Sequence, residues 1–195
     1  MWQIHNPEIR TATLDFGSSD QGLVNVSQLY SDDVQLINAI ELVEWDTNEN
    51  QVLVCEACGF VQCKPGDWVS LRRAEPLILV LPAFDVFVEN EKANDEYSPP
   101  WYISKKGTAY FDPATYESLQ ANHSALPPVE SIRGLNMREA ILIFQWEAPC
   151  SSSAGHRNVL VIKMILSVPH LKEFILSISD VWRNLLTRTP PMRRQ

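Results

Sequence analysis

The last part of the chain has the most regular pattern of apolar and polar positions. Between Pro169 and Arg188 apolar residues return at helical spacing, which places them along one side of an α-helix. Pro169 suits a first helical turn, and Pro190 with Pro191 follows the last one. The pattern predicts a long amphipathic C-terminal helix at 169–188 that packs on a sheet. Its apolar positions are Leu171, Phe174, Ile175, Ile178, Val181, Trp182, Leu185 and Leu186.

Two segments before this helix are apolar on both sides of an extended chain. They span residues 139–147 and 157–167. Near-continuous apolar runs are typical of strands that are covered on both faces, so both segments are predicted as central strands of a sheet. The link between them is short and polar, which favours an antiparallel pair with Cys150 and His156 in the connecting loop.

The middle of the chain predicts a β-hairpin. Apolar and polar residues alternate over 67–73, and a second, mostly apolar run at 76–82 follows after a short link. The sequence Lys-Pro-Gly-Asp at 64–67 is typical of a turn, and it precedes the first of these strands. A further short strand is expected at 51–57.

Two helices are predicted in addition to the C-terminal one. The first spans 111–124, where Asp112 can accept a hydrogen bond at the helix start and Pro113 suits the first helical position. The second spans 31–40 and begins with a pair of acidic residues, but its pattern is less regular.

Several intervals have weaker patterns. Residues 41–55 fit either a continuing helix or two strands around a turn at 47–50. The intervals 89–101 and 122–134 are predicted as loops, because each is polar and contains a diproline. Such a loop either borders a binding cleft or simply connects two elements. Trp101, directly after the first diproline, is expected to be partly exposed and available for contact with a partner.

Together these elements predict an α+β fold with a mainly antiparallel sheet, covered by the long C-terminal helix and one or two shorter helices. The 195 residues, of which 45 % are hydrophobic, suffice for one well-packed core. No linker divides the chain, so residues 1–188 are expected to form a single domain. Residues 189–195 are expected to be a basic, disordered tail.

The charge and the hydropathy of the chain exclude some classes of partner. The formal net charge is −8, and four arginines lie between 183 and 195, so the rest of the chain is more acidic still. An acidic surface repels nucleic acid and favours a basic protein partner. No apolar run is long enough to span a membrane, and no signal peptide is visible, so a soluble cytoplasmic protein is expected.

Three of the four cysteines lie close together in the sequence. Cys55, Cys58 and Cys63 have the spacing C-x2-C-x4-C, and a glycine follows the second of them. The first five residues of this stretch resemble a zinc knuckle, which is half of a zinc-ribbon site. A structural zinc needs four ligands. The fourth would come from Cys150 or His156, or else from His123.

Two other interpretations of the cysteines stay open. A reactive dithiol usually lies at the start of a helix, whose dipole lowers the thiol pKa, whereas the residues after Cys58 are rich in turn formers. Cysteine is also among the residue types most often buried, so the cluster fits a packed turn between strands as well. The sequence alone does not decide between zinc, reactive thiols and a packed turn.

No spacing in the chain matches a nucleophile elbow, a phosphate-binding glycine loop or a histidine metal motif. The protein is therefore expected to be a non-enzymatic binding or protein-interaction module, with one structural zinc where the metal interpretation holds. The alternative is a small enzyme that uses a redox dithiol, or Cys58 or Cys63 as nucleophile together with His156 or His123.

Overall fold

The structure is a computed structural model, and it describes residues 1–17, 22–45, 49–83 and 98–147. The chain divides into two compact units, of which the first is Met1–Leu135 and the second begins at Asn136. The predicted strand at 157–167 and the predicted helix at 169–188 lie outside the described residues, as does the predicted tail. A single domain over 1–188 stays a prediction.

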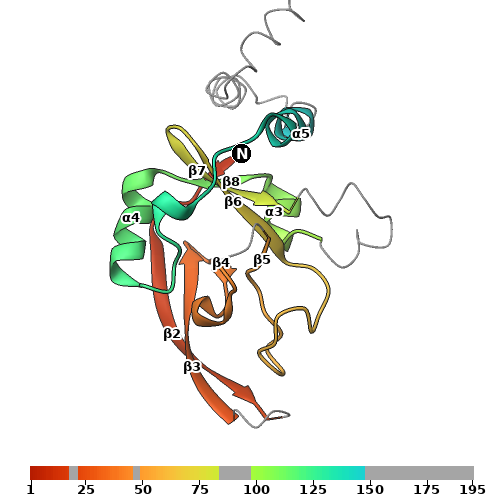
Figure 1. Ribbon diagram of the computed structural model, residues 1–195. Coiled ribbons are helices and arrows are strands. Elements are labelled where there is room, and N and C mark those ends of the chain that lie inside the picture. Colours follow the sequence, from red (N-terminus) through yellow and green to blue (C-terminus); the bar gives the residue numbers. More distant parts are fainter. Residues whose placement is uncertain (18–21, 46–48, 84–97, 148–195) are drawn as a thin grey trace, which may run out of the picture. The chain divides into compact units, whose positions relative to one another are not determined.

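The first unit contains a five-stranded sheet with the order β1-β8-β7-β6-β5 (Figure 1). All neighbouring strands in it are antiparallel, except that β1 and β8 run parallel. The hairpin predicted for the middle of the chain is confirmed as β6 and β7, while the strand predicted at 51–57 is reduced to β5. The strands are β1 Trp2–Gln3, β5 Asn50–Gln51, β6 Trp68–Ala74, β7 Leu77–Pro82 and β8 Ala109–Phe111.

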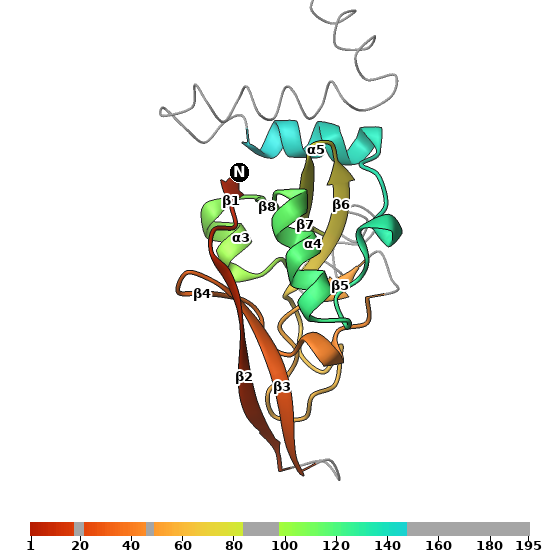
Figure 2. The same cartoon turned by 90° about the vertical axis from the view of Figure 1, so that its left-hand side faces the viewer.

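A second sheet of the same unit has three antiparallel strands in the order β2-β3-β4. Its two long strands, β2 Pro7–Phe16 and β3 Gly22–Ser31, form a long hairpin (Figure 2). The sequence interpretation assigned no element to these residues. In the structure, half-buried and exposed positions alternate along much of β2, for example at Ile9 and Arg10. This alternation is typical of a strand with one covered face.

The helix predicted at 31–40 is wrong. Asp32 and Asp33 form the tight turn between β3 and β4 Val34–Ile37, and Asp32 adopts a positive φ of 51°. Aspartate tolerates this left-handed conformation better than most residues do, so an acid pair fits a hairpin turn as well as a helix start. Directly after β4, the chain makes the short 3₁₀ helix η1 Ile40–Leu42.

The helix predicted at 111–124 is confirmed as α4 Pro113–Asn122, which contacts β7. Its cap is the predicted one, because the Thr115 N–H donates to Asp112 Oδ1 at 3.0 Å. The short helix α3 Trp101–Lys106 comes before it, and Trp101 is 47 % exposed, as expected. None of the helices within the described part of the chain combines the length and the apolar character that a membrane span requires.

The strand predicted at 139–147 is also wrong, because these residues belong to the helix α5 Met137–Glu147 of the second unit. A capping box starts this helix. The Glu139 N–H donates to Asn136 Oδ1 and the Asn136 N–H donates to Glu139 Oε2, both at 2.9 Å. An apolar run of this length fits a buried helix as well as a strand, and the cap decides between them.

The core of the first unit is formed by the five-stranded sheet and the segments that cover it. Ile78, Leu79 and Leu81 of β7 are fully buried, as are Tyr102 of α3 and Tyr116 of α4. Both tyrosines keep their hydroxyl groups hydrogen-bonded to main-chain carbonyls, which removes the cost of burying them. The described elements therefore form an α+β fold with mainly antiparallel sheets.

Candidate metal centre

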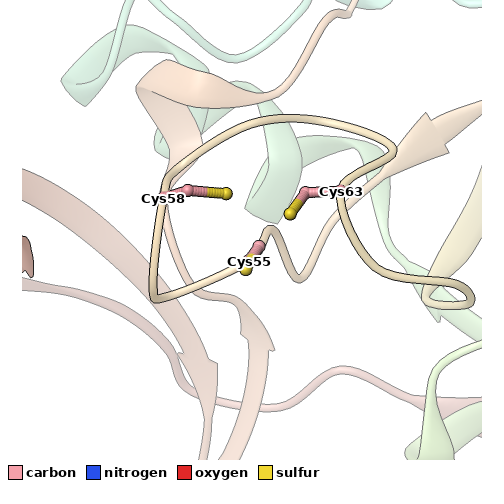
Figure 3. A group of neighbouring side chains, drawn as sticks. All are labelled: Cys55, Cys58 and Cys63. Atoms are coloured by element: carbon pink, nitrogen blue, oxygen red, sulfur yellow. The ribbon is translucent and has the colours of Figure 1, made fainter. Parts of the chain in front are cut away.

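Cys55, Cys58 and Cys63 all lie on the loop that joins β5 to β6. Their three sulfur atoms lie within 4.8 Å of one another. Cys58 and Cys63 point toward each other across the loop, and Cys55 lies between them (Figure 3). The loop therefore brings all three thiols to one place, although they are up to eight positions apart in the sequence.

The first turn of the loop depends on Gly59. Its N–H donates to the carbonyl oxygen of Cys55 at 2.7 Å, and its φ is 71°, a conformation that favours glycine. A Cβ atom at this position would lie 2.8 Å from Cζ of Phe16, which is fully buried at the end of β2. The glycine therefore allows both the left-handed turn and its close packing against the long hairpin.

The side chain of Asn38 holds the main chain directly before the first cysteine. Its Nδ2 donates to the carbonyl oxygen of Val54 at 2.9 Å, and its Oδ1 accepts from the Val54 N–H at 2.8 Å. The amide of Asn38 thus makes the same pair of hydrogen bonds to Val54 that a residue of a neighbouring strand would make. Because Asn38 is buried, water does not compete for these hydrogen bonds. The position of Cys55 is fixed accordingly.

The side chain of Gln51 holds the loop on both sides of Cys63. Its Nε2 donates to the carbonyl oxygens of Lys64 and Gly66, each at 2.9 Å. Its Oε1 accepts from the Gln62 N–H at 2.7 Å. Gln51 is only 1 % exposed. One buried amide therefore fixes the main chain immediately before and after the third cysteine.

A small apolar cluster packs against the cysteine loop. It contains Val54, which is fully buried, together with Val26 of β3 and Ala39. Val61, between the second and the third cysteine, packs against the same cluster. The neighbouring Phe60 is 57 % exposed instead. The loop is thus anchored to the fold by valines and amides rather than by the thiols themselves.

The pKa values of Cys55 and Cys63 are shifted in opposite directions. The pKa of Cys55 is lowered, first because the Ala57 N–H donates to its sulfur and then because the Cys58 thiol does so. The pKa of Cys63 is raised to about 11, because its hydrogen bonds to Cys58 and Cys55 favour the protonated form. Cys55 therefore loses its proton more readily than Cys63 does.

The spacing of the sulfur atoms suits a tetrahedral metal ion. With zinc–sulfur bonds of about 2.3 Å, two thiolates of a tetrahedral site lie about 3.8 Å apart. The observed limit of 4.8 Å is close to that separation, so a shift of the side chains by less than about 1 Å would complete the contacts. Soft thiolate ligands select zinc, copper(I) or iron–sulfur clusters.

His123, one of the proposed fourth ligands, does not join the three cysteines. Its Nε2 lies 3.1 Å from Oε1 of Glu41. The two carboxylate oxygens of Glu41 also accept from the Ser27 N–H, at 3.1 and 2.9 Å. Partial burial tends to raise the pKa of Glu41, but the hydrogen bonds from Ser27 and the adjacent His123 outweigh it, and the pKa is lowered. His123 therefore joins the end of α4 to η1 and β3.

The other two proposed ligands, Cys150 and His156, lie outside the described residues. Within those residues, the group of candidate ligands consists of the three cysteines alone. The absence of a helix after Cys58 is confirmed, because the residues between Gly59 and Asp67 form turns, bends and irregular backbone. The arrangement that lowers the pKa of many catalytic dithiols is therefore missing from this loop.

Two residues that position the site, Asn38 and Gln51, were not identified from the sequence. Asn38 lies in the apolar stretch Leu-Ile-Asn-Ala-Ile, and Gln51 directly precedes Val-Leu-Val. A polar residue inside an apolar run is a signal that could have found them, because a buried amide must have hydrogen-bond partners. Their partners, however, are main-chain atoms up to 16 residues away, which the pattern does not show.

The fold and the cysteine loop were also compared with known proteins. None of the protein-family models, curated proteins or solved structures matches the chain. The chain is therefore not assigned to a family, and what it does has to be inferred from the geometry of its own residues.

Proposed function

We propose that this protein is a non-enzymatic protein-interaction module in which Cys55, Cys58 and Cys63 bind a structural zinc ion. The observation that carries the proposal is the approach of the three sulfur atoms to within 4.8 Å on one loop. The side-chain amides of Asn38 and Gln51 support it, because they hold the main chain before Cys55 and around Cys63 and leave all three thiols available.

A structural role suits the loop better than a catalytic one. Between β5 and β6 the chain has no regular secondary structure, so few main-chain hydrogen bonds hold it. A metal ion cross-links such a loop, and its binding free energy adds to the stability of the fold. In this proposal the fourth ligand is Cys150 or His156, which completes the closed coordination that is typical of structural zinc.

The partner in this proposal is a basic protein. The net charge of −8 favours attraction of a positively charged surface and disfavours nucleic acid. Two exposed aromatic side chains are candidate contacts, since Phe60 is 57 % and Trp101 47 % exposed. The cytoplasm is the proposed location, because a reducing compartment keeps clustered thiols free for a metal.

Mass spectrometry under native conditions, on protein purified without chelator, tests the metal site. We expect one zinc ion per chain, which is lost on acid denaturation. Cys58→Ser removes a ligand and is expected to abolish stable zinc binding. His123→Gln is the matched control, and it is expected to keep the zinc because the structure places His123 beside Glu41.

The same experiment identifies the fourth ligand. Cys150→Ser and His156→Ala are each measured, and the one that weakens zinc retention supplies it. A metal-free protein with four free thiols would contradict the proposal. If one thiol of that protein then reacted with iodoacetamide far faster than the others, the alternative of a small cysteine enzyme would replace it.

A further inference from the structure

A cleft that is separate from the cysteine loop opens on the first unit. It has a volume of about 370 Å³, which lies in the size range of small-molecule sites. One wall comes from β5 and β6, through Asn50, Leu71 and Arg72, and the opposite wall comes from the segment 124–133 that follows α4. Among the described residues, no cysteine lines the cleft.

The charge in the cleft is opposite to that of the chain as a whole. Its charged lining residues are Arg72 and Arg133, and no carboxylate lines it among the described residues, although the formal net charge of the protein is −8. Arg72 is only 6 % exposed, and its Nη1 donates to the Leu71 carbonyl oxygen at 3.0 Å. Arginine is seldom buried to this extent, and its planar guanidinium matches the geometry of oxyanions.

Hydrogen bonds fix the second wall against the first. The Arg73 N–H donates to the Arg133 carbonyl oxygen at 2.8 Å, and the Leu135 N–H donates to the Arg73 carbonyl oxygen at 3.0 Å. The buried Tyr116 hydroxyl donates to the Pro127 carbonyl oxygen at 2.9 Å. Arg72 and Arg133 are therefore held on two elements that are joined directly beside them, and the cleft is formed before any ligand arrives.

An aromatic side chain completes the lining. Trp45 lines the cleft, and its Nε1 donates to the Ile40 carbonyl oxygen at 3.2 Å. Leu126 and Pro127 add apolar surface from the opposite wall. The cleft thus combines two cationic groups with a half-buried indole ring, and this combination suits a ligand with an anionic group attached to a planar body.

We propose that this cleft binds a small organic oxyanion, namely a phosphate monoester or a carboxylate attached to a planar ring. Its oxygen atoms lie against the guanidinium groups of Arg72 and Arg133, and its ring packs against Trp45. The site does not depend on the zinc proposal, because it shares no residue with the cysteine loop.

Nuclear magnetic resonance on the full-length protein tests this site. Phenyl phosphate, benzoate and inorganic phosphate are titrated separately at fixed ionic strength, and the indole N–H signal of Trp45, assigned with Trp45→Phe, is followed. We expect phenyl phosphate or benzoate to shift this signal and to saturate it. The tighter of the two probes shows whether the natural ligand is a phosphate or a carboxylate. Inorganic phosphate is expected to bind more weakly than phenyl phosphate, because it has no ring.

Two arginine variants separate the cleft from general charge attraction. Arg133→Gln is expected to weaken binding about tenfold, through the loss of one charge-assisted contact. Arg73→Gln is the matched control. It also removes one exposed charge, but Arg73 is not among the described residues that line the cleft, and its side chain forms an ion pair with Glu75 instead. Binding to this variant is expected to change less than about twofold.

Two results would overturn the proposal. The first is that neither phenyl phosphate nor benzoate shifts the Trp45 signal at millimolar concentration. The second is that Arg133→Gln and Arg73→Gln weaken binding equally, which would show attraction to surface charge rather than a site. Neither the Trp45 signal nor the affinities of the two variants measures the metal content. A failure of the cleft proposal is therefore distinct from a failure of the zinc proposal.

Discussion

The buried amides of Asn38 and Gln51 hold the main chain of the cysteine loop in place. Together they form five hydrogen bonds with main-chain atoms before Cys55 and around Cys63. Removing either side chain would leave main-chain groups unpaired, at about 1–3 kcal/mol for each of the buried ones, which are the Val54 N–H and carbonyl and the Gly66 carbonyl. At the scale of single residues, two side-chain amides therefore fix the main chain that carries the thiols. A bound metal would add its binding free energy to the stability of this loop.

Gly59→Ala tests this positioning at one residue. We expect it to lower the free energy of unfolding by about 1–3 kcal/mol, because alanine is strained at positive φ and its Cβ would press on Phe16. Zinc affinity is expected to fall with it, since the turn between Cys55 and Cys58 is displaced. Urea denaturation and a zinc competition assay measure the two effects.

Gly134→Ala is the control for this variant. A Cβ at Gly134 meets nothing within 4 Å, so the substitution is expected to leave the stability nearly unchanged. Equal stability of Gly59→Ala and Gly134→Ala would show that the turn of the cysteine loop is not constrained as described.

At the scale of elements, the local pattern of apolar and polar residues predicted some helices and strands correctly and others wrongly. The hairpin β6–β7 and the helix α4 were predicted because their signals, alternation and an Asp-Pro start, are contained within each segment. The helix expected at 31–40 and the strand expected at 139–147 were wrong, since a tight turn and a capping box decided these segments. Short apolar runs fit both periodicities, so neither segment could be settled by its pattern alone.

Glu41 joins three elements, β3, η1 and α4, through Ser27 and His123. Glu41→Gln is expected to lower the stability at pH 7 by about 1 kcal/mol, a modest value because the carboxylate is partly exposed and solvent screens it. The pKa of Glu41 is lowered in the folded protein. Its contribution is therefore complete above the unfolded pKa of about 4.5, and it is lost as the pH falls through the folded pKa.

Chemical denaturation between pH 7 and pH 3 measures this contribution as the difference between the wild type and Glu41→Gln. The difference is expected to shrink below pH 4.5, the ordinary pKa of the carboxyl. If zinc is bound as proposed, its loss at low pH affects both proteins alike and cancels in the difference. Glu117→Gln, an exposed position on α4, is the control and is expected to show little difference at any pH. A difference that grows toward acid pH would contradict the described role of Glu41.

At the scale of the whole molecule, the sequence predicted the fold class and the place of the candidate site but not how the site is built. The spacing of Cys55 and Cys58 brings these two residues together locally. The position of Cys63 depends instead on Gln51, and the packing of Gly59 depends on Phe16 in a distant hairpin. Such long-range contacts leave no periodic trace in the sequence, so only the structure connects these residues.

Zinc is expected to stabilise the whole first unit. A ligand present at about 100 times its dissociation constant adds about 2.7 kcal/mol to the free energy of unfolding. A chelator should therefore lower the melting temperature of the wild type, and added zinc should restore it. Cys58→Ser is expected to respond to neither. A wild type that melts at the same temperature with and without chelator would show that the loop holds no structural metal.

The most direct test of the central claim is X-ray absorption spectroscopy at the zinc edge on the purified protein. The account predicts one bound zinc ion with three or four sulfur neighbours at about 2.3 Å, and with one nitrogen neighbour in the case of three. A protein without zinc, or a zinc ion surrounded only by oxygen and nitrogen, would contradict the assignment of Cys55, Cys58 and Cys63 as its ligands.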